Sequence, residues 1–390
     1  MKIKNSGRGH AYEEQDIIAV TNAMRDADPY TQGKYQTLFE NDFSTYLGSN
    51  IQSFAVSSGT AALELAAILS GLNSNDEVII PAHTFCATAI PFARTGAKIV
   101  WADINETTFV ASVDSIEELV TSRTKVIVAV HLYGLMVDMN RLMGIAEQHN
   151  ILVVEDCAQA LGAEIDGKKA GTFGDFSCFS FHSHKVITTL GEGGMLGLKS
   201  VALSKQVHGL KHNGLRSFGE RKEYWKPAMS NVDFDINGFW PYNFCIGEIQ
   251  CAVGASLLNR IDSLLQNRMD RANQIIKGLK DFPELKFQFT PIGYKNTHYT
   301  LPAFVDPKYG INNDSIINLL HRKYNITAVV QYYPLYRYPM FIKAKFEKNN
   351  CSKTDLFFDN MISFPNHDEI TSQEVNYLIE SVKSVIKELR

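Results

Sequence analysis

Short apolar segments alternate with helix-like segments through the first two thirds of this chain, and the alternation strongly restricts the possible folds. Several of the apolar runs are continuous, as expected of strands that are covered on both faces. A succession of this kind indicates an α/β fold with a mostly parallel sheet flanked by helices. Strands are expected at 77–80, 98–102, 125–130, 151–155, 176–181 and 194–198, and helices at 60–69, 115–120 and 139–148.

The last third of the chain has a different pattern. Apolar residues at helical spacing run through 246–279 and predict a helix, or a pair of helices, that connects two domains. After Pro283 come shorter strand-like runs and two amphipathic segments at 315–324 and 373–386, which suit a small α+β domain of roughly a hundred residues. We therefore expect a large domain at 1–255, including an N-terminal arm, and a small C-terminal domain at 256–390.

The composition is that of an ordinary soluble globular protein. A net charge of −4 over 390 residues argues against nucleic acid as the main partner, and no apolar run approaches the roughly 20 residues of a membrane helix. The N-terminal segment is polar and lacks the apolar centre of a signal peptide. Six cysteines without metal-binding spacing favour buried thiols in a reducing compartment, so we expect a cytoplasmic protein without a metal site.

Lys185 follows a strand-like run and precedes a glycine-rich return in the segment FSCFSFHSHKVITTLGEGGML. Most lysines are solvated surface charges, but an amine in an apolar pocket has a lowered pKa and attacks an aldehyde carbon as the neutral base. Upstream, ILVVEDCAQALGA places Asp156 at the end of an apolar run and Gln159 just beyond it. Side chains at successive strand ends of one α/β sheet face one crevice. Pyridoxal phosphate needs this pair, because the lysine holds its aldehyde while the aspartate keeps its ring nitrogen protonated.

A phosphate site is indicated by FAVSSGTAALELAAIL, where a short strand leads through Ser58, Gly59 and Thr60 into an alanine-rich helix. Free backbone N–H groups at such a helix start, with hydroxyls beside them, favour a phosphate dianion. The simpler alternative is that Ser58 or Thr60 only caps the helix. Ser180, five residues before Lys185, offers a second hydroxyl at the end of its strand. A cofactor held by both segments would have its aldehyde near the lysine.

Two further candidates have plain alternatives. Phe85 comes just after a strand end in PAHTFCATA, where its ring could stack on a flat heterocycle or belong to the core. Asn243 lies in the turn-like GFWPYNFCIGEIQ before the long helical segment, where on its own it reads only as a turn residue.

Together these motifs resemble the DegT/StrS-type (DegT/DnrJ/EryC1/StrS) family of pyridoxal-phosphate-dependent aminotransferases, whose usual substrates are keto sugars carried on nucleotides. The resemblance covers nearly the full length and implies a fold type I pyridoxal-phosphate enzyme. Its landmarks stand in order: YTQGKYQTLFENDFSTYLGS, VSSGTAALELA, EVIIPAHTFCATA, VHLYGLMVDM, VVEDCAQALGAEIDGKKAGTFGDFSCFSFHSHK, GEGGML, PYNFCIGEIQCAVGASLL, VVQYYPLY and FPNHDEIT.

The resemblance implies a role for each matching residue. Lys185 is implied to carry the aldehyde of pyridoxal 5'-phosphate, Asp156 to hold the ring nitrogen and Gln159 to donate to the ring hydroxyl oxygen. Phe85 is implied to stack on the ring. The phosphate cup is implied to consist of Ser58, Gly59, Thr60 and Ser180, with Asn243 reaching in from the other subunit of a homodimer.

The implied reaction is a ping-pong transfer of an amino group to a ketone, in which the released Lys185 amine moves the proton. L-Glutamate is the implied donor, and glutamine is the alternative. Relatives with histidine at the lysine position eliminate a hydroxyl instead, and here the lysine is present. A regulator that binds the cofactor without turnover would be favoured by loss of Lys185 or Asp156, and both are present.

Departures from the family pattern concern the acceptor. The chain has Asn243, Phe244 and Cys245 where many members have Asn-Tyr-Arg, and 331–333 read Gln-Tyr-Tyr where many have a histidine before the aromatic residue. We expect a nucleotide-linked keto sugar for polysaccharide or amino-sugar biosynthesis. The alternative is a small phosphorylated ketone, such as dihydroxyacetone phosphate giving serinol phosphate. Candidate acceptor contacts are His182, His184, Lys211, His212, Arg216, Arg221, Lys222, Gln331, Tyr332 and Tyr333.

Overall fold

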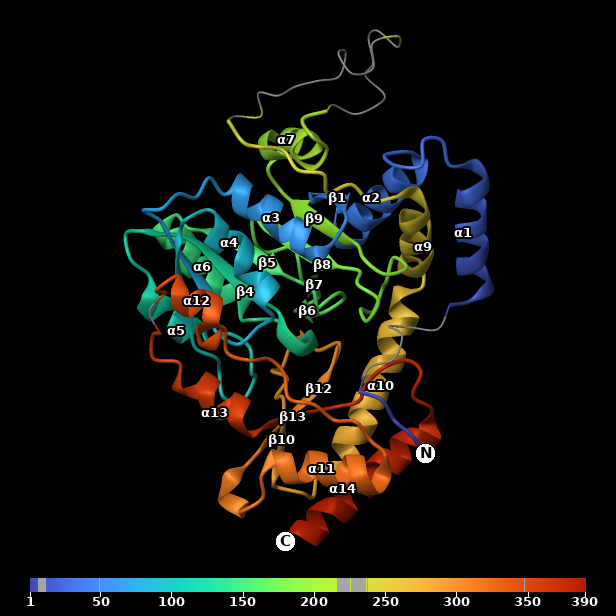
Figure 1. The fold of residues 1–390 in the computed structure, drawn as a ribbon, viewed down its shortest axis with the longest axis vertical. Helices are drawn as coiled ribbons and strands as arrows, with labels where there is room; N and C mark the ends of the chain where they lie inside the picture. The colour runs from blue at the N-terminus through green and yellow to red at the C-terminus, as the bar shows by residue number, and fades with distance from the viewer. Residues whose placement is uncertain (6–11, 49, 216–224, 226–235, 237, 347) are drawn as a thin grey trace.

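A computed structural model describes residues 1–5, 12–48, 50–215, 225, 236, 238–346 and 348–390 of the chain. Figure 1 shows an elongated molecule in which a large body built on one sheet occupies one end and a smaller body the other. Helix α10 (Ile261–Leu279) runs from the first body into the second, and both chain termini lie at the smaller end. The helical spacing at 246–279 corresponds to α9 (Glu248–Leu258) followed by α10.

The sheet of the large body has seven strands and is mostly parallel. Strand β9 runs antiparallel to its neighbours β1 and β8, and every other neighbouring pair is parallel. This confirms the expected α/β fold. In sheet order the strands are β1 (Gln52–Val56), β9 (Gly194–Leu198), β8 (Phe176–Ser180), β5 (Leu152–Asp156), β4 (Thr124–Val130), β2 (Glu77–Pro81) and β3 (Lys98–Ala102).

The expected strands agree closely with these bounds. Those at 98–102 and 194–198 are the same, and the others differ by one residue at one or both ends. Successive side chains of β2 and β9 are all buried, so both faces of the sheet are covered. This burial explains why the sequence has continuous apolar runs there and no alternation with polar residues.

Helices flank this sheet, and α3 packs against β8 and β9. A Cβ atom at Gly59, the first residue of α3, would lie 2.8 Å from Cβ of Ser180, so glycine permits the close approach of the helix to the strand end. The sequence interpretation did not include α1, α2, α4 or α7. The helices of the large body are α1 (Glu14–Asp26), α2 (Lys34–Leu47), α3 (Gly59–Leu69), α4 (Ile90–Arg94), α5 (Val113–Leu119), α6 (Met139–His149), α7 (Val201–Lys211) and α9.

The smaller body is an α+β unit, as expected. Its antiparallel sheet has the order β10, β12, β13, and α10 and α11 pack against α14. A short strand, β11 (Tyr294–Lys295), instead pairs with β6 (Glu164–Ile165), which also pairs with β7 (Lys168–Lys169). The remaining elements are β10 (Leu285–Phe287), β12 (Leu301–Val305), α11 (Asn313–Tyr324), α12 (Pro339–Lys343), α13 (Ser352–Asn360), β13 (Met361–Phe364) and α14 (Ser372–Leu389).

The buried apolar residues form two clusters, one in each body, and some residues late in the chain belong to the cluster of the large body. Leu265 belongs to the cluster of the large body and Ala272 to that of the smaller body, so the change occurs within α10. Helices α12 and α13 return to the large body, where Phe341 and Phe357 join its cluster. The division after residue 255 therefore stays a prediction. Among the residues that the structure describes, no helix is both long and apolar enough to span a bilayer.

Candidate active site

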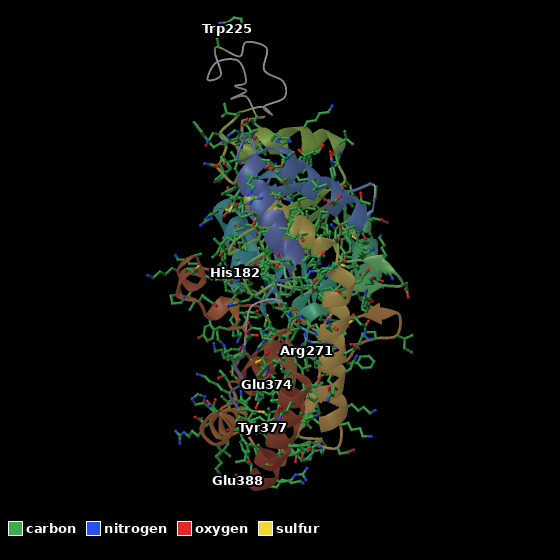
Figure 2. All side chains as sticks on the ribbon, turned by 90° about the vertical axis from the view of Figure 1, so that its right-hand side faces the viewer. His182, Trp225, Arg271, Glu374, Tyr377 and Glu388 are labelled. Carbon is green, nitrogen blue, oxygen red and sulfur yellow. The ribbon has the colours of Figure 1, made fainter. Side chains whose placement is uncertain are left out.

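A cavity of about 390 Å³ lies where the parallel strands end, the usual ligand position in open α/β sheets. It brings together residues from segments that are far apart in the chain. In Figure 2 His182, one of them, lies about midway along the long axis, away from Glu374, Tyr377 and Glu388 of α14. Of the residues predicted from the sequence, the cavity is lined by Ser58, Gly59, Thr60, Phe85, Asp156, Gln159, Ser180, His182, His184, Lys185, Gln331 and Tyr332.

Asp156 ends β5 and reaches the cavity as a carboxylate that is only 5% exposed. Its Oδ2 atom accepts a hydrogen bond of 2.8 Å from Thr88 Oγ1, and its Oδ1 atom accepts one of 3.1 Å from the backbone N–H of Ala158. The two donors fix the direction of the carboxylate. A carboxylate fixed in this way is suited to hold a proton on a heterocyclic nitrogen.

The start of α3 forms a second wall of the cavity. Ser58 caps the helix, because its Oγ accepts a hydrogen bond of 3.0 Å from the N–H of Ala61. This confirms the capping alternative without excluding an anion site, since the first turn of a helix presents several N–H groups without intrahelical partners. Gly59 lies against Ser180 at the end of β8. The two hydroxyl-bearing segments predicted to hold a phosphate are therefore adjacent.

Lys185 lies in the turn after β8, where its backbone N–H donates to the carbonyl of His182 over 2.8 Å. Its side chain is half-buried, and Nζ lies 4.5 Å from the centroid of the Tyr299 ring, which is a cation–π contact. Tyr299 also lines the cavity, just before β12. The lysine amine is therefore held inside the cavity beside an aromatic ring.

Gln159 and Tyr332 form one hydrogen-bonded unit in the cavity wall. Gln159 Oε1 accepts a hydrogen bond of 2.9 Å from the backbone N–H of Tyr133, and Gln159 Nε2 donates one of 2.9 Å to the Tyr332 hydroxyl. Because an amide nitrogen carries two hydrogens, the second remains for a ligand oxygen. The predicted donor role of Gln159 is thus compatible with its contacts.

Phe85 stands at the mouth of the same cavity. Its side chain is 53% exposed, and its ring meets the Tyr332 ring edge-on with 6.2 Å between the centroids. Such exposure is unusual for a core phenylalanine, so the core alternative is wrong. An aromatic face at the mouth is available to a flat heterocycle.

Two histidines line the cavity beside Lys185. The rings of His182 and His184 are perpendicular, with 5.1 Å between centroids, and His182 Nε2 lies 3.8 Å from Glu192 Oε1. Partial burial, followed by the charges of His182 and Lys185, lowers the pKa of His184 below its usual value. His184 is therefore neutral near neutral pH.

Lys211 does not lie where the sequence analysis placed it. Its Nζ atom is buried in the large body, 3.2 Å from Glu40 Oε1 and 2.9 Å from the Ala55 carbonyl oxygen, and it does not line the cavity. The sequence around Lys211 did not indicate this burial, because its partner Glu40 lies 171 residues away in the chain. The expectation that Lys211 contacts the acceptor is therefore wrong.

Other predicted contacts lie elsewhere. Tyr333 is 44% exposed and packs edge-on against Tyr338 and Phe358, outside the cavity lining. Asn243 is exposed and pairs with His212 in an isolated bridge, so its place in a partner's site stays a prediction. Arg216, Arg221 and Lys222 lie outside the described residues.

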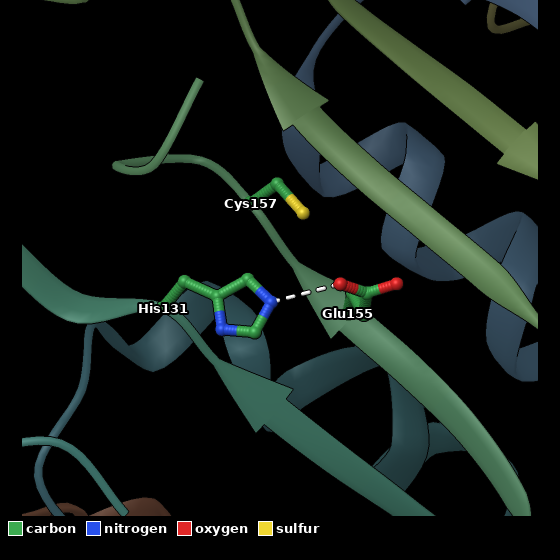
Figure 3. A group of neighbouring side chains, drawn as sticks. All are labelled: His131, Glu155 and Cys157. Carbon is green, nitrogen blue, oxygen red and sulfur yellow. Dashed lines mark hydrogen bonds and ion pairs between the residues drawn. The ribbon is translucent and has the colours of Figure 1, made fainter. Parts of the chain in front are cut away.

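A buried cluster beside the cavity has the side chains of a metal site (Figure 3): His131, which also lines the cavity, Glu155 and Cys157. The carboxylate is already fully used, since Glu155 Oε2 lies 2.9 Å from His131 Nε2 and both of its oxygens accept backbone N–H groups from 171–174. Burial alone would raise the pKa of Glu155, but these hydrogen bonds together lower it. The cluster therefore anchors the loop that follows β7 and leaves no carboxylate lone pair suited to a cation.

Three functional residues were missed in the sequence: Thr88, Tyr133 and Tyr299. Thr88 follows Phe85 within the same motif, so its spacing was an available signal. Tyr299 has no local signal, because only the fold brings it to the cavity wall. Tyr133 lies within the landmark VHLYGLMVDM, but it does not line the cavity, and only the fold shows its contact with Gln159. Thr88 contacts Asp156, Tyr133 contacts Gln159, and Tyr299 contacts Lys185. The motifs did identify these three partners.

Comparison with known proteins defines the class. The model of the DegT/DnrJ/EryC1/StrS aminotransferase family matches residues 11–383, and the chain therefore belongs to this family and is an aminotransferase. A GDP-perosamine synthase of Escherichia coli O157:H7 is 31% identical over 90% of this chain and 90% of its own length.

Solved structures agree with the family assignment. PseC of Helicobacter pylori, an aminotransferase involved in the biosynthesis of pseudoaminic acid, has a TM-score of 0.89 and 26% identity over 100% of both chains. The putative sugar aminotransferase Spr1654 of Streptococcus pneumoniae, in its PLP form, has a TM-score of 0.87 and 28% identity over 100% of both chains. The similar solved structures therefore include an aminotransferase in a PLP form.

Proposed function

We propose that this aminotransferase uses pyridoxal 5'-phosphate to transfer an amino group from L-glutamate to the keto group of a nucleotide-linked sugar. The observation that carries the proposal is the convergence of Lys185, Asp156 and the start of α3 on one cavity. These groups match an aldehyde, a ring nitrogen and a phosphate, respectively. The product would serve amino-sugar or polysaccharide biosynthesis.

The donor set of the cavity fits this cofactor. Lys185 would carry the aldehyde, Asp156 would hold the ring nitrogen, and the segment 58–60 with Ser180 would bind the phosphate. The close contact between Gly59 and Ser180 supports the phosphate seat, because a Cβ atom there would fill the space between helix and strand end. When bound, the cofactor supplies a conjugated ring that accepts the electron pair released at the substrate carbon.

The protein side of the mechanism follows from the contacts. Asp156, fixed by Thr88, would hold a proton on the ring nitrogen of the bound cofactor. Lys185 Nζ would hold the aldehyde and, as a free amine, would act as the base for the proton at the substrate carbon. The Tyr299 ring at 4.5 Å restricts where this amine can move.

Sugar nucleotides are the favoured acceptors because of the relatives. GDP-perosamine synthases of Escherichia coli O157:H7 and Vibrio cholerae are 31% and 28% identical to this chain over 90% and 91% of its length. A Micromonospora megalomicea dTDP-3-amino-3,4,6-trideoxy-alpha-D-glucose transaminase is 27% identical over 96%. These names support a nucleotide-linked acceptor over a small phosphorylated ketone.

A homodimer with shared sites is part of the proposal. The exposed apolar side chains of Ile17 on α1 and Leu190 after Lys185 line a second hollow, together with Val253 of α9. An apolar hollow beside the active-site turn supports contact with a second copy, which would bring Asn243 to the phosphate. The six unpaired cysteines support a reducing compartment, and we propose the cytoplasm.

The reaction is tested in two half-reactions. The protein loaded with pyridoxal phosphate should show a visible absorption band that disappears on addition of L-glutamate, with one 2-oxoglutarate released per site. Keto-sugar nucleotides should then restore the band, whereas dihydroxyacetone phosphate should not. Glutamine in place of glutamate tests the donor. No band change with either donor would exclude the proposal, and restoration by the triose phosphate alone would move the acceptor to small ketones.

Shared sites are tested by mixing two inactive variants. Lys185→Ala and Asn243→Ala subunits, refolded together in equal amounts, form mixed dimers in which one site has both residues intact. About a quarter of the wild-type activity should return, because half of the dimers are mixed and each has one competent site. Absence of any recovery, with mixed dimers demonstrated by mass spectrometry, would contradict the shared site.

A further inference from the structure

A buried polar chain joins the large body to the segment 331–333. The hydroxyl of Tyr133 donates to the backbone carbonyl of Gln331 over 2.7 Å, and His83 Nε2 lies 2.7 Å from the same hydroxyl. A phenol has one proton, which goes to Gln331, so His83 must be the donor to the Tyr133 oxygen. Both His83 and Tyr133 are almost completely buried, and neither lines the cavity.

The neutral forms of His83 and Tyr133 are compatible with this direction of donation. Burial lowers the pKa of His83 to about 3, while contact with the Tyr332 backbone partly offsets the effect. The imidazole is therefore neutral at working pH and carries one N–H. Tyr133 remains a phenol, because burial and the neighbouring Tyr332 raise its pKa well above the usual value. In this arrangement the single N–H of His83 is directed to the Tyr133 oxygen, and the Tyr133 hydroxyl is directed to Gln331.

Tyr133 has a second contact from its backbone. Its N–H donates to Gln159 Oε1 over 2.9 Å, and the Gln159 amide in turn donates to the Tyr332 hydroxyl over 2.9 Å. One residue therefore holds both partners of the Gln159 and Tyr332 unit, the first through its backbone and the second through Gln331. Tyr133 also has φ +65°, a left-handed conformation that is costly for a bulky side chain and is retained where function requires it.

We propose that Tyr133, supported by His83, is a positioning residue that sets the Gln159 and Tyr332 donors against the ligand in the cavity. The inference rests on the proposed function for the identity of the ligand, a cofactor whose ring hydroxyl oxygen would accept from these donors. Gln331 lines the cavity, and its side-chain Oε1 atom is buried without a hydrogen-bond partner among the described residues. An acceptor of this kind beside two donors is typical of a site that binds a polar ligand.

The first test needs no cofactor. Tyr133→Phe keeps the ring and the backbone N–H but removes the hydroxyl, so the segment 329–333 loses one of its hydrogen bonds to the large body. Hydrogen exchange of the unloaded protein, followed by mass spectrometry, should show that this segment exchanges roughly tenfold faster than in the wild type. His83→Leu should give the same change, and His83→Gln, which keeps an N–H donor, should restore part of the protection. Unchanged exchange in Tyr133→Phe would overturn the proposal.

The second test measures the ligand environment. Donors at the ring hydroxyl oxygen stabilise its anionic form, so their displacement should raise the pH midpoint of the visible band of the loaded protein, by roughly half a unit or more. Tyr133→Phe and Tyr332→Phe should both show this rise. In the double variant the two shifts should not add, because Tyr133 acts through Tyr332. A loss of stability alone would not move this midpoint.

Tyr333→Phe is the matched control, because Tyr333 is the next residue but packs outside the cavity lining. It should change neither the exchange nor the midpoint. If the wild type forms no visible band, the proposed function fails, while the exchange experiment still decides the positioning role. If the band forms and its midpoint is the same in Tyr133→Phe, the positioning role is wrong and the proposed function stands.

Discussion

The residues expected to bind the ring nitrogen and the phosphate of the cofactor lie at strand ends and at a helix start, whereas two residues expected to touch the acceptor lie on connecting segments. Asp156 and Ser180 are the last residues of β5 and β8, and Gly59 is the first residue of α3. His182 and Tyr332 belong instead to connecting segments. The first group is held by the central sheet, and the second can vary without changing that sheet.

The difference extends to the hydrogen bonds. The Asp156 carboxylate has partners for both oxygens from nearby segments of the large body. Tyr332 reaches its partner Gln159 across a sequence separation of 173 residues. The Asp156 carboxylate is therefore fixed within the large body, whereas the position of Tyr332 depends on how the returning segment 331–333 is docked.

The largest effect is expected from Lys185→Ala. Loss of the amine removes both the covalent anchor and the base, so turnover should fall by at least about 10⁴-fold while pyridoxamine phosphate still binds. Single-turnover absorbance and equilibrium dialysis measure the two properties separately. Lys205→Ala, at an exposed position of α7, is the matched control and should behave as the wild type. Near-normal transamination by Lys185→Ala would show that Lys185 neither holds the cofactor nor acts as the base.

Asp156→Asn should have the next largest effect. An amide cannot hold a proton on the ring nitrogen, so the glutamate half-reaction should slow by roughly 10²- to 10³-fold, with little change in fold. Thr88→Val keeps the carboxylate and removes one donor, and it should cost about tenfold or less. Stopped-flow absorbance after mixing with glutamate gives both rates. Equal rates for Asp156→Asn and the wild type would show that Asp156 does not act on the ring.

Lys185 and Asp156, the main subjects of these two predictions, were already identified in the sequence, because each lies within a short recognisable motif. Asp156, Lys185 and Gly59 follow recognisable strands within motifs of a few residues, and strands with continuous apolar runs are easy to locate. Lys211 was misassigned because its partner Glu40 lies 171 residues away. Tyr133 was missed for the same reason, since its hydroxyl contact to Gln331 spans 198 residues. Contacts of this range depend on the tertiary fold and leave no periodic signal.

Phe85→Leu should have a moderate effect that is confined to cofactor affinity. Leucine keeps the apolar volume at the cavity mouth but lacks the aromatic face, so the dissociation constant of pyridoxal phosphate should rise by up to about tenfold. Fluorescence titration measures this constant, and Phe85→Tyr, which retains a ring, should bind as the wild type does. An unchanged dissociation constant of pyridoxal phosphate in Phe85→Leu would indicate that Phe85 contacts the acceptor and not the cofactor.

The smallest effect on the site is expected from Lys211→Met, which separates stability from recognition. The substitution leaves Glu40 without its buried cation and the Ala55 carbonyl without its donor, so the free energy of unfolding should fall by about 3 kcal/mol. The acceptor KM should stay unchanged, because Lys211 does not line the cavity. The double variant Glu40→Gln with Lys211→Met should recover part of the stability in urea denaturation, because it removes the unpaired charge. A raised acceptor KM at unaltered stability would instead show that Lys211 contacts the acceptor. The C-terminal end of α7 would then have to move toward the ligand.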